Sequence, residues 1–275
     1  MKRWTAVDSL EEKNRWERLS RWLNEQGAPN EYVPWTGGMA AMSNLEGFTG
    51  LDHVRLSSRF SPTIVPLLTI QSSWITVLGV IDGMVRQEKN WWPLCALYEV
   101  FSTILIELGQ EVDARGSVMV AGAGGAARAA VAAFFKAGFR RFSVVNMREA
   151  EAKKLIRDVE RRFFGLKISF VPIDRIVLLP GETTALVNCA DPVEETQLLN
   201  ELSYLNFLRR PGFIFDLQTR KPSRSPLTNA ADSGITTISG ADIAARTDVL
   251  WAKWAFQIDM DYKAYRAHIE KSVDF

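Results

Sequence analysis

The feature that most constrains the fold of this chain is a glycine-rich turn between two apolar runs. Residues 118–121 are apolar, the glycine cluster begins at Gly122, and residues 126–137 are rich in alanine. A second short apolar run follows at residues 142–146. This order predicts a strand, a tight turn, a helix and a second strand. The turn has the form G-x-G-x-x-[G/A], the arrangement that binds dinucleotides.

Each small residue of the turn has its own physical role. Gly122 permits a tight turn because it lacks a Cβ atom, and Gly124 lets the backbone approach a pyrophosphate. Ala127 lets the helix pack closely on the strand, while free N–H groups and the helix dipole face the phosphates. An ordinary strand–helix turn is the alternative interpretation. The residues expected to hold the cofactor phosphates are Gly122, Ala123, Gly124, Gly125, Ala126 and Ala127.

Composition excludes several classes of protein. A net charge of +1 over 275 residues gives no strong attraction to nucleic acid or to anionic membranes. Cys95 and Cys189 form no C-x-x-C motif, and His53 and His268 lack metal-ligand spacing, so no metal site is expected. The most apolar stretch, residues 64–85, is interrupted by polar residues, which argues against a membrane span. We therefore expect a soluble, cytoplasmic protein.

The rest of the chain alternates strand-like and helix-like segments. We predict a helix that begins near residue 8 and carries a core stripe of tryptophan and leucine up to residue 27. Further helices are expected at about residues 62–70, 95–108, 147–164 and 243–260, followed by a charged helical tail. Strands are expected at residues 4–7, 32–35, 52–56, 76–81, 168–171, 185–188, 213–217 and 236–238, with a hairpin-like excursion at 83–92. This alternation is typical of an α/β fold with a parallel sheet.

Around the glycine turn the sequence resembles the shikimate dehydrogenase family, whose turn reads G-A-G-G-A-[AS]-R. Residues 215–217 and 225–227 resemble the family's D-L-x-Y-x-P…T-P-L segment, and residues 240–243 resemble the start of its last helix. Upstream, residues 47–68 resemble the G-x-x-x-x-N-V-T-x-P-x-K segment, and residues 78–83 resemble I-G-A-V-N-T. The resemblance therefore covers most of the chain in order.

This resemblance implies a two-domain α/β protein. A Rossmann NAD(P)-binding domain would span residues 101–242, and an α/β substrate domain would span residues 1–100. The C-terminal helices, residues 243–275, would complete the substrate domain. The family reaction is reversible hydride transfer between NADP and a ring hydroxyl of shikimate, with a Lys–Asp pair that assists proton transfer.

The family's proton-transfer pair is absent at the corresponding positions. Arg59 stands at the lysine and Leu97 at the aspartate. Arginine stays protonated and cannot exchange a proton as a tuned lysine does, although it can hold a carboxylate or phosphate in a bidentate fork. Asp82, at the family's substrate-binding asparagine, is the nearest candidate proton carrier. Arg59 and Asp82 are thus the candidate catalytic residues.

Other substrate-binding positions also differ from the family. Arg55 replaces the threonine of N-V-T, Thr247 falls near the family glutamine, and Ser9 is what remains of the S-L-S-P motif. Shikimate oxidation by the family mechanism is therefore not expected. The alternative for Arg55 and Arg59 is that both point to solvent. The substrate-binding residues predicted from the resemblance are Ser9, Arg55, Arg59, Asp82 and Thr247.

The end of the second strand favours NADP over NAD. An NAD site usually has Asp or Glu there to accept hydrogen bonds from the ribose 2′-OH, whereas this chain has Asn146. The missing carboxylate removes a repulsion against a 2′-phosphate, and Arg148 is placed to pair with it. Met147 stands where the family has arginine, so a plain surface charge is the alternative for Arg148. The resemblance adds Asn188, Leu217 and Gly240 to the cofactor-binding residues.

Two functions stay open. The first is a divergent NADP-dependent oxidoreductase, with NAD as the alternative cofactor, acting on a CH–OH group of a substrate other than shikimate. The second is a catalytically inactive dinucleotide-binding protein with a sensor or scaffold role, which the apolar residues Leu94, Ala96 and Leu97 favour. Both imply a small-molecule ligand and neither nucleic acid nor membrane as partner. A homodimer stays open.

Overall fold

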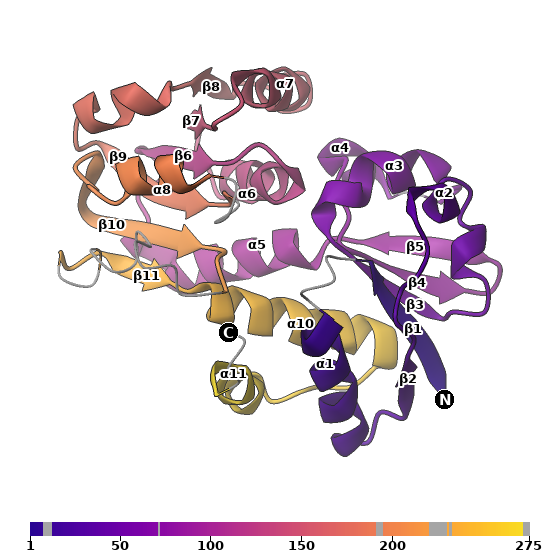
Figure 1. Ribbon diagram of the computed structural model, residues 1–275. Coiled ribbons are helices and arrows are strands. Elements are labelled where there is room, and N and C mark those ends of the chain that lie inside the picture. Colours follow the sequence, from indigo (N-terminus) through magenta and orange to yellow (C-terminus); the bar gives the residue numbers. More distant parts are fainter. Residues whose placement is uncertain (8–12, 71, 191–194, 220–229, 231–232, 272–275) are drawn as a thin grey trace. The chain divides into compact units, whose positions relative to one another are not determined.

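The computed structural model describes residues 1–7, 13–70, 72–190, 195–219, 230 and 233–271. The chain divides into two compact units (Figure 1). Unit 1 combines Met1–Ala96 with Thr247–Tyr262, and unit 2 combines Leu97–Arg246 with the chain from Lys263 onward. The predicted domains, residues 1–100 with 243–275 and residues 101–242, stay a prediction. Among the described residues, no helix has the length and apolar character needed to cross a membrane.

Unit 1 is built on a mixed five-stranded sheet with the order β2-β1-β3-β4-β5. β1 pairs in parallel with both β2 and β3, whereas β3–β4 and β4–β5 are antiparallel. The strands are β1 (Lys2–Val7), β2 (Asn30–Tyr32), β3 (His53–Leu56), β4 (Gly83–Gln87) and β5 (Asn90–Leu94). The helices are α1 (Lys13–Glu25), α2 (Met39–Met42), η2 (Glu46–Phe48), η3 (Ser58–Phe60), α3 (Ser61–Ile64), η4 (Val65–Leu67) and α4 (Ser73–Leu78).

The core of unit 1 is aromatic. Trp4 of β1 is fully buried, and its ring lies 4.8 Å from that of Trp251 and 6.4 Å from that of Trp16. Trp16, Leu19 and Leu23 of α1 are buried at helical spacing, which confirms the predicted core stripe. β4 and β5 form the hairpin predicted at residues 83–92.

Two predictions for unit 1 were wrong. Residues 76–81 do not form a strand, because α4 occupies Ser73–Leu78. The Ser72 side chain accepts the Ile75 N–H at the start of this helix, and Gly79 ends it with φ of +63°. These two caps outweigh the strand preference of the β-branched residues 75–77. The strand expected at residues 32–35 lies earlier, as β2.

Unit 2 contains a six-stranded parallel sheet with the order β11-β10-β9-β6-β7-β8. Read from β8, this is the order 3-2-1-4-5-6 of doubly wound dinucleotide-binding sheets. The strands are β6 (Ser117–Ala121), β7 (Arg141–Val145), β8 (Lys167–Phe170), β9 (Thr183–Asn188), β10 (Leu208–Asp216) and β11 (Thr236–Ile238). The helices are α5 (Ala96–Leu108), η5 (Gly109–Glu111), α6 (Gly125–Lys136), α7 (Glu149–Glu160), η6 (Ile173–Leu178), α8 (Thr196–Leu202), α10 (Gly240–Phe256) and α11 (Tyr262–Glu270).

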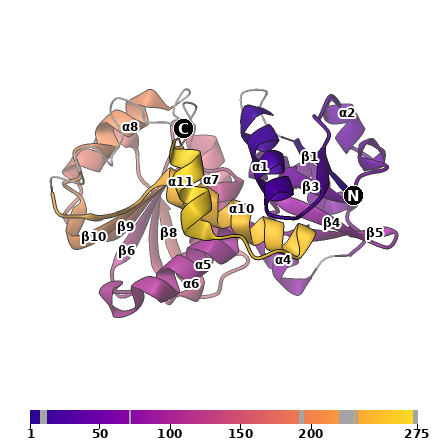
Figure 2. The same ribbon diagram turned by 90° about the horizontal axis from the view of Figure 1, so that it is seen from below.

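Helices cover both faces of this sheet, with α5 and α6 on one face and α8 on the other (Figure 2). Phe101 of α5, Phe134 of α6 and Phe215 of β10 meet edge to face, and all three are fully buried. The predicted strand–turn–helix–strand unit is therefore confirmed as β6-α6-β7. α10 is shared by the two units, because the boundary after Arg246 falls inside this helix.

Candidate functional site

The glycine turn after β6 has a backbone that only glycine adopts without strain. Gly122 has φ of +93°, and its N–H donates to the Val145 carbonyl at 2.9 Å. A Cβ atom at this position would lie 2.9 Å from the carbonyl oxygen of Cys189. Both the left-handed backbone and the approach of the chain after β9 therefore require glycine at this position.

Gly124 differs from Gly122, because no contact with the described residues requires it to be glycine. Its φ is −80°, and a Cβ atom added there meets no atom within 4 Å. Gly124 is the N-cap of the 12-residue helix α6, which has no side-chain cap and no acidic residue in its first turn. The first N–H groups of α6 thus have no side-chain cap, and the open space above Gly124 leaves room for an anion at this helix N-terminus. The predicted turn residues fit a pyrophosphate.

The end of β7 carries the residues predicted to face the adenosine ribose. Asn146 is buried, and its Nδ2 donates to the Arg148 carbonyl at 3.2 Å and to Glu151 Oε2 at 3.3 Å. Its Oδ1 is buried and has no hydrogen-bond partner within the described chain. Met147 is partly exposed, and Arg148 forms an exposed ion pair of 2.7 Å with Glu151. Arg148 would therefore have to exchange this partner to hold a 2′-phosphate.

Asn188, Leu217 and Gly240 lie close together at the carboxyl ends of β9 and β10. The Asn188 Nδ2 donates to Asp216 Oδ1 at 2.9 Å, and the Leu217 N–H donates to the Asn188 carbonyl at 3.0 Å. A Cβ atom at Gly240 would lie 2.1 Å from the Gln218 carbonyl oxygen. Gly240, the first residue of α10, thus lets that helix begin directly against the end of β10.

A residue that the sequence analysis missed lies at the same sheet edge. Gln218 is 9% exposed, and neither its Oε1 nor its Nε2 has a hydrogen-bond partner among the residues that the structure describes. Buried side-chain amides are normally satisfied. Because Gln218 follows the predicted cofactor-binding residue Leu217, the sequence could have drawn attention to it. The burial of its side chain, however, cannot be read from a sequence.

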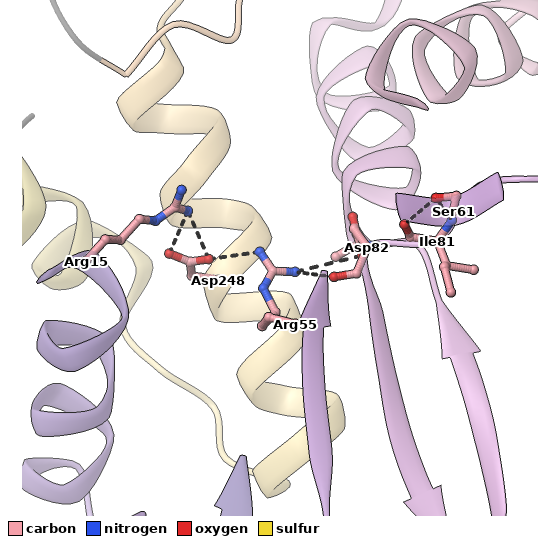
Figure 3. A network of polar contacts seen from close by, with 7 residues as sticks. Arg15, Arg55, Ser61, Ile81, Asp82 and Asp248 are labelled. Atoms are coloured by element: carbon pink, nitrogen blue, oxygen red, sulfur yellow. Dashed lines mark hydrogen bonds and ion pairs between the residues drawn. The ribbon is translucent and has the colours of Figure 1, made fainter. Parts of the chain in front are cut away.

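Unit 1 contains a buried cluster of four charged side chains (Figure 3). Arg55 Nη2 lies 3.1 Å from Asp248 Oδ1, and Arg55 Nη1 lies 3.8 Å from Asp82 Oδ1. Arg15 Nη2 lies 3.1 Å from Asp248 Oδ2. The exposed fractions of the side chains are 1% for Asp248, 6% for Arg55, 8% for Asp82 and 16% for Arg15. We call these four residues the ion cluster.

The elements around the ion cluster hold its members in place. The Arg55 guanidinium lies 5.6 Å from the ring centroids of both Trp16 and Trp251. Asp82 Oδ1 accepts the Ala96 N–H at 2.8 Å. The Ser61 hydroxyl donates to the Ile81 carbonyl and accepts the Ile81 N–H, which fixes the chain just before Asp82 (Figure 3). Each charge therefore has opposite charges or hydrogen bonds inside unit 1.

The structure thus brings together some of the predicted substrate residues and separates others. Arg55 and Asp82 meet in the ion cluster, and Thr247 is buried on α10 next to Asp248. Arg55 is buried, so the alternative that it points to solvent was wrong. Arg59 is exposed in η3, with its guanidinium over the Phe60 ring. Ser9 lies outside the described residues.

The sequence did not reveal Asp248 as the partner of both Arg55 and Arg15. Asp248 is 193 residues away from Arg55 in sequence, and Arg15 is 233 residues away from Asp248. The only hint of this pairing in the sequence was that the helix beginning at Gly240 carries a carboxylate. Across the described part of the chain, no group of three or more His, Cys, Asp or Glu side chains is placed to hold a metal ion.

No protein-family model and no curated protein matches the sequence. Solved structures match it over almost its whole length. Shikimate 5-dehydrogenase of Thermus thermophilus, in complex with NADP(H) and shikimate, is 19% identical, with a TM-score of 0.75 and coverage of 98% of this chain and 99% of that one. Quinate dehydrogenase of Corynebacterium glutamicum, in complex with NAD, is 16% identical, with a TM-score of 0.80 and coverage of 99% of both chains.

Shikimate dehydrogenase of Mycobacterium tuberculosis is also 16% identical, with a TM-score of 0.75 and coverage of 99% of this chain and 100% of that one. The chain therefore has the two-domain shikimate dehydrogenase fold, with a Rossmann-like domain. The resemblance read from the glycine turn and its flanking segments is confirmed at the level of the fold.

Proposed function

We propose that this protein binds a nicotinamide dinucleotide on unit 2 and is an oxidoreductase for a CH–OH group of a small molecule other than shikimate. The observation that carries the proposal is the turn from Gly122 to Gly124, with its required glycine, its open approach and the uncapped 12-residue helix behind it. The similar structures bound to NADP(H) and to NAD support the same cofactor class.

The residues of unit 2 fit such a cofactor. The N–H groups at the start of α6 bind the pyrophosphate, and the unpartnered Oδ1 of Asn146 accepts a hydrogen bond from the adenosine ribose. The absence of a carboxylate at Asn146 favours NADP, with NAD as the alternative, and Arg148 supplies a positive charge for the 2′-phosphate. When bound, the nicotinamide group supplies hydride transfer.

Unit 1 supplies the proposed substrate contacts. Arg59 is exposed, and a guanidinium holds a carboxylate or phosphate in two parallel hydrogen bonds. Arg55, Asp82 and Thr247 complete the proposed substrate residues, and Asp82 is the proposed proton carrier. Because Asp82 already accepts the Ala96 N–H and faces Arg55, proton transfer would require one of these contacts to loosen.

The ion cluster favours a second candidate function, dinucleotide binding without turnover. Arg55 faces Asp248 and Asp82 faces Arg55, so a substrate would have to displace a charge of the protein itself to pair with either residue. Leu97, which stands at the family's aspartate, carries no proton. A protein of this kind would report or respond to the dinucleotide without consuming it.

One experiment separates the two functions. NADPH and NADH are titrated with the intrinsic fluorescence of the reduced nicotinamide as the signal, and hydroxy and keto acids, including shikimate, are then screened for turnover. Gly124→Val is the matched control, because its side chain fills only the open approach. Binding with turnover supports the oxidoreductase, and binding without turnover supports the second function. If neither dinucleotide binds, or if Gly124→Val binds as the wild type does, both proposals fail.

A further inference from the structure

Gln218 holds a buried primary amide without partners. Its side chain is about nine-tenths buried, and both amide atoms lack hydrogen bonds within the described residues. An unsatisfied buried donor or acceptor costs roughly 1–3 kcal/mol, so both atoms together impose a substantial penalty on the free protein. A ligand that pairs with both amide atoms would remove this penalty.

The place of Gln218 in the sheet indicates which part of a ligand it meets. In a sheet of order 3-2-1-4-5-6, the dinucleotide crosses the switch point, here between β6 and β9, at the carboxyl ends of the strands. Asn146, at the end of β7, lies on the adenosine side. Gln218 comes two residues after the end of β10, on the opposite side, where the nicotinamide half of the ligand lies.

The backbone of Gln218 is fixed on two sides. Its N–H donates to Asp216 Oδ1 at 3.1 Å, and the same oxygen accepts the Asn188 amide. Its carbonyl lies against Gly240, where any side chain would collide. The side-chain amide is therefore attached to a rigid point of the sheet edge, which favours a defined hydrogen-bond geometry.

Resting on the proposed function, we propose that Gln218 recognises the carboxamide of the nicotinamide ring. A primary amide offers one acceptor and two donors, and so does the carboxamide. Gln218 Nε2 donates to the carboxamide oxygen, and Gln218 Oε1 accepts from the carboxamide nitrogen. This pairing satisfies both orphaned atoms at once, which neither a carboxylate nor an ammonium group does.

The test compares three ligands on the wild type and on Gln218→Leu. The ligands are NADPH, its reduced 3-acetylpyridine analogue, in which a methyl group replaces the carboxamide nitrogen, and 2′-phospho-ADP-ribose, which lacks the nicotinamide. The wild type is expected to prefer NADPH over the analogue by about tenfold, because the analogue leaves Oε1 unpaired. Gln218→Leu is expected to bind NADPH and the analogue equally, and to bind 2′-phospho-ADP-ribose as the wild type does.

The outcomes separate the two proposals. If Gln218→Leu keeps the preference for NADPH over the analogue, or if the wild type has no such preference, the role of Gln218 is refuted while dinucleotide binding stands. If the wild type binds neither NADPH nor NADH, the proposed function fails and this inference with it. Gln218→Met provides the same readout should the leucine variant not fold. Circular dichroism checks the fold of each variant.

Discussion

At the scale of single residues, the ion cluster shows how buried charges depend on their partners. Asp248 is 1% exposed and lies between the guanidinium groups of Arg15 and Arg55. Burying such charges costs several kcal/mol each, which their attraction offsets only when the geometry is good and every group has a partner. Removing one member therefore leaves the others buried and uncompensated.

The first prediction concerns Asp248→Asn. The variant keeps the shape of the side chain but removes the negative charge that faces two arginines, so we expect the free energy of unfolding to fall by about 3 kcal/mol. Asp259→Asn is the matched control, because the Asp259 side chain is 83% exposed in its ion pair with Lys253. That control is expected to change stability by less than about 0.5 kcal/mol. Equal effects in urea denaturation would contradict the prediction.

The second prediction concerns His53, which is buried in β3 and packs edge-on against Phe256. Burial, with a smaller effect of the Lys2 ammonium, lowers the pKa of His53 from 6.5 to about 4. Between these values the unfolded chain binds a proton that the folded chain does not, so stability falls as the pH falls from 6.5 to about 4. The loss attributable to His53 approaches about 3 kcal/mol at the lower end.

His53→Leu isolates this contribution. The variant has no imidazole to protonate in the unfolded state, so its free energy of unfolding should fall less steeply with acid than that of the wild type. Urea denaturation at several pH values between 7 and 4 measures the two slopes. Identical slopes would show that His53 protonates equally in both states.

The aligned segments pointed to Arg55 and Asp82, whose roles stay predictions, whereas residues whose surroundings depend on packing alone were not found. Arg55 and Asp82 follow from aligned segments around β3 and α4, and the structure brings them within 3.8 Å. Gln218 and Asp248 belong to no motif. Their importance comes from burial and from partners, or the lack of them, which depend on contacts between segments far apart in the sequence.

At the scale of elements, the turn between β6 and α6 contains glycines with two different roles. One glycine is needed by the fold, and the other leaves space for a ligand. Gly122 is required by the protein, through its φ of +93° and the nearby Cys189 carbonyl, whereas a Cβ atom added at Gly124 meets no atom of the described residues within 4 Å. Stability and ligand binding should therefore respond differently to the two alanine substitutions.

The third prediction compares Gly122→Ala with Gly124→Ala. Gly122→Ala should lose about 1–3 kcal/mol of stability, because alanine is strained at this φ and its Cβ atom collides with a backbone oxygen. Gly124→Ala should keep its stability within about 0.5 kcal/mol but bind NADPH about tenfold more weakly or worse, since its methyl group stands where the pyrophosphate approaches. Thermal unfolding and NADPH titration test the pair. A stable Gly122→Ala, or a Gly124→Ala with full affinity, would contradict this account of the turn.

The elements of unit 2 were more predictable than those of unit 1. Buried parallel strands produce apolar runs such as those of β9 and β10, and these are visible in a sequence. α4 was not recognised because its β-branched residues Ile75, Thr76 and Val77 favour a strand. Its helical state depends on Ser72 and Gly79, two caps whose effect appears only when both ends are considered together.

At the scale of the whole molecule, the chain leaves unit 1 after Ala96 and returns to it at Thr247. The resemblance to a two-domain family implies a path of this kind, in which the chain leaves the first domain near residue 100 and returns to it near residue 243. Within unit 2, Arg266 of α11 lies 3.2 Å from Asp242 of α10. This ion pair joins α10 and α11, and such a contact between two helices has no local signature in the sequence.

The path of the chain links the stability of the two units. Unit 1 consists of two stretches separated by about 150 residues, Leu97–Arg246. While unit 2 is folded, its ends are held close, since Arg246 of α10 pairs with Glu107 of α5 at 2.9 Å. If unit 2 unfolds, the same segment becomes a loop whose closure costs roughly 4 kcal/mol. Unit 1 should therefore lose most of its own stability when unit 2 unfolds.

The fourth prediction uses the position of the tryptophans. All nine, residues 4, 16, 22, 35, 74, 91, 92, 251 and 254, belong to unit 1, whereas the proposed dinucleotide site belongs to unit 2. At 100 times its Kd, NADPH stabilises the folded state by about 2.7 kcal/mol. We expect the denaturation midpoint to rise equally by tryptophan fluorescence and by circular dichroism at 222 nm. If NADPH instead moves only part of the dichroism transition and leaves the fluorescence transition in place, the units unfold independently, and loop closure contributes little to unit 1.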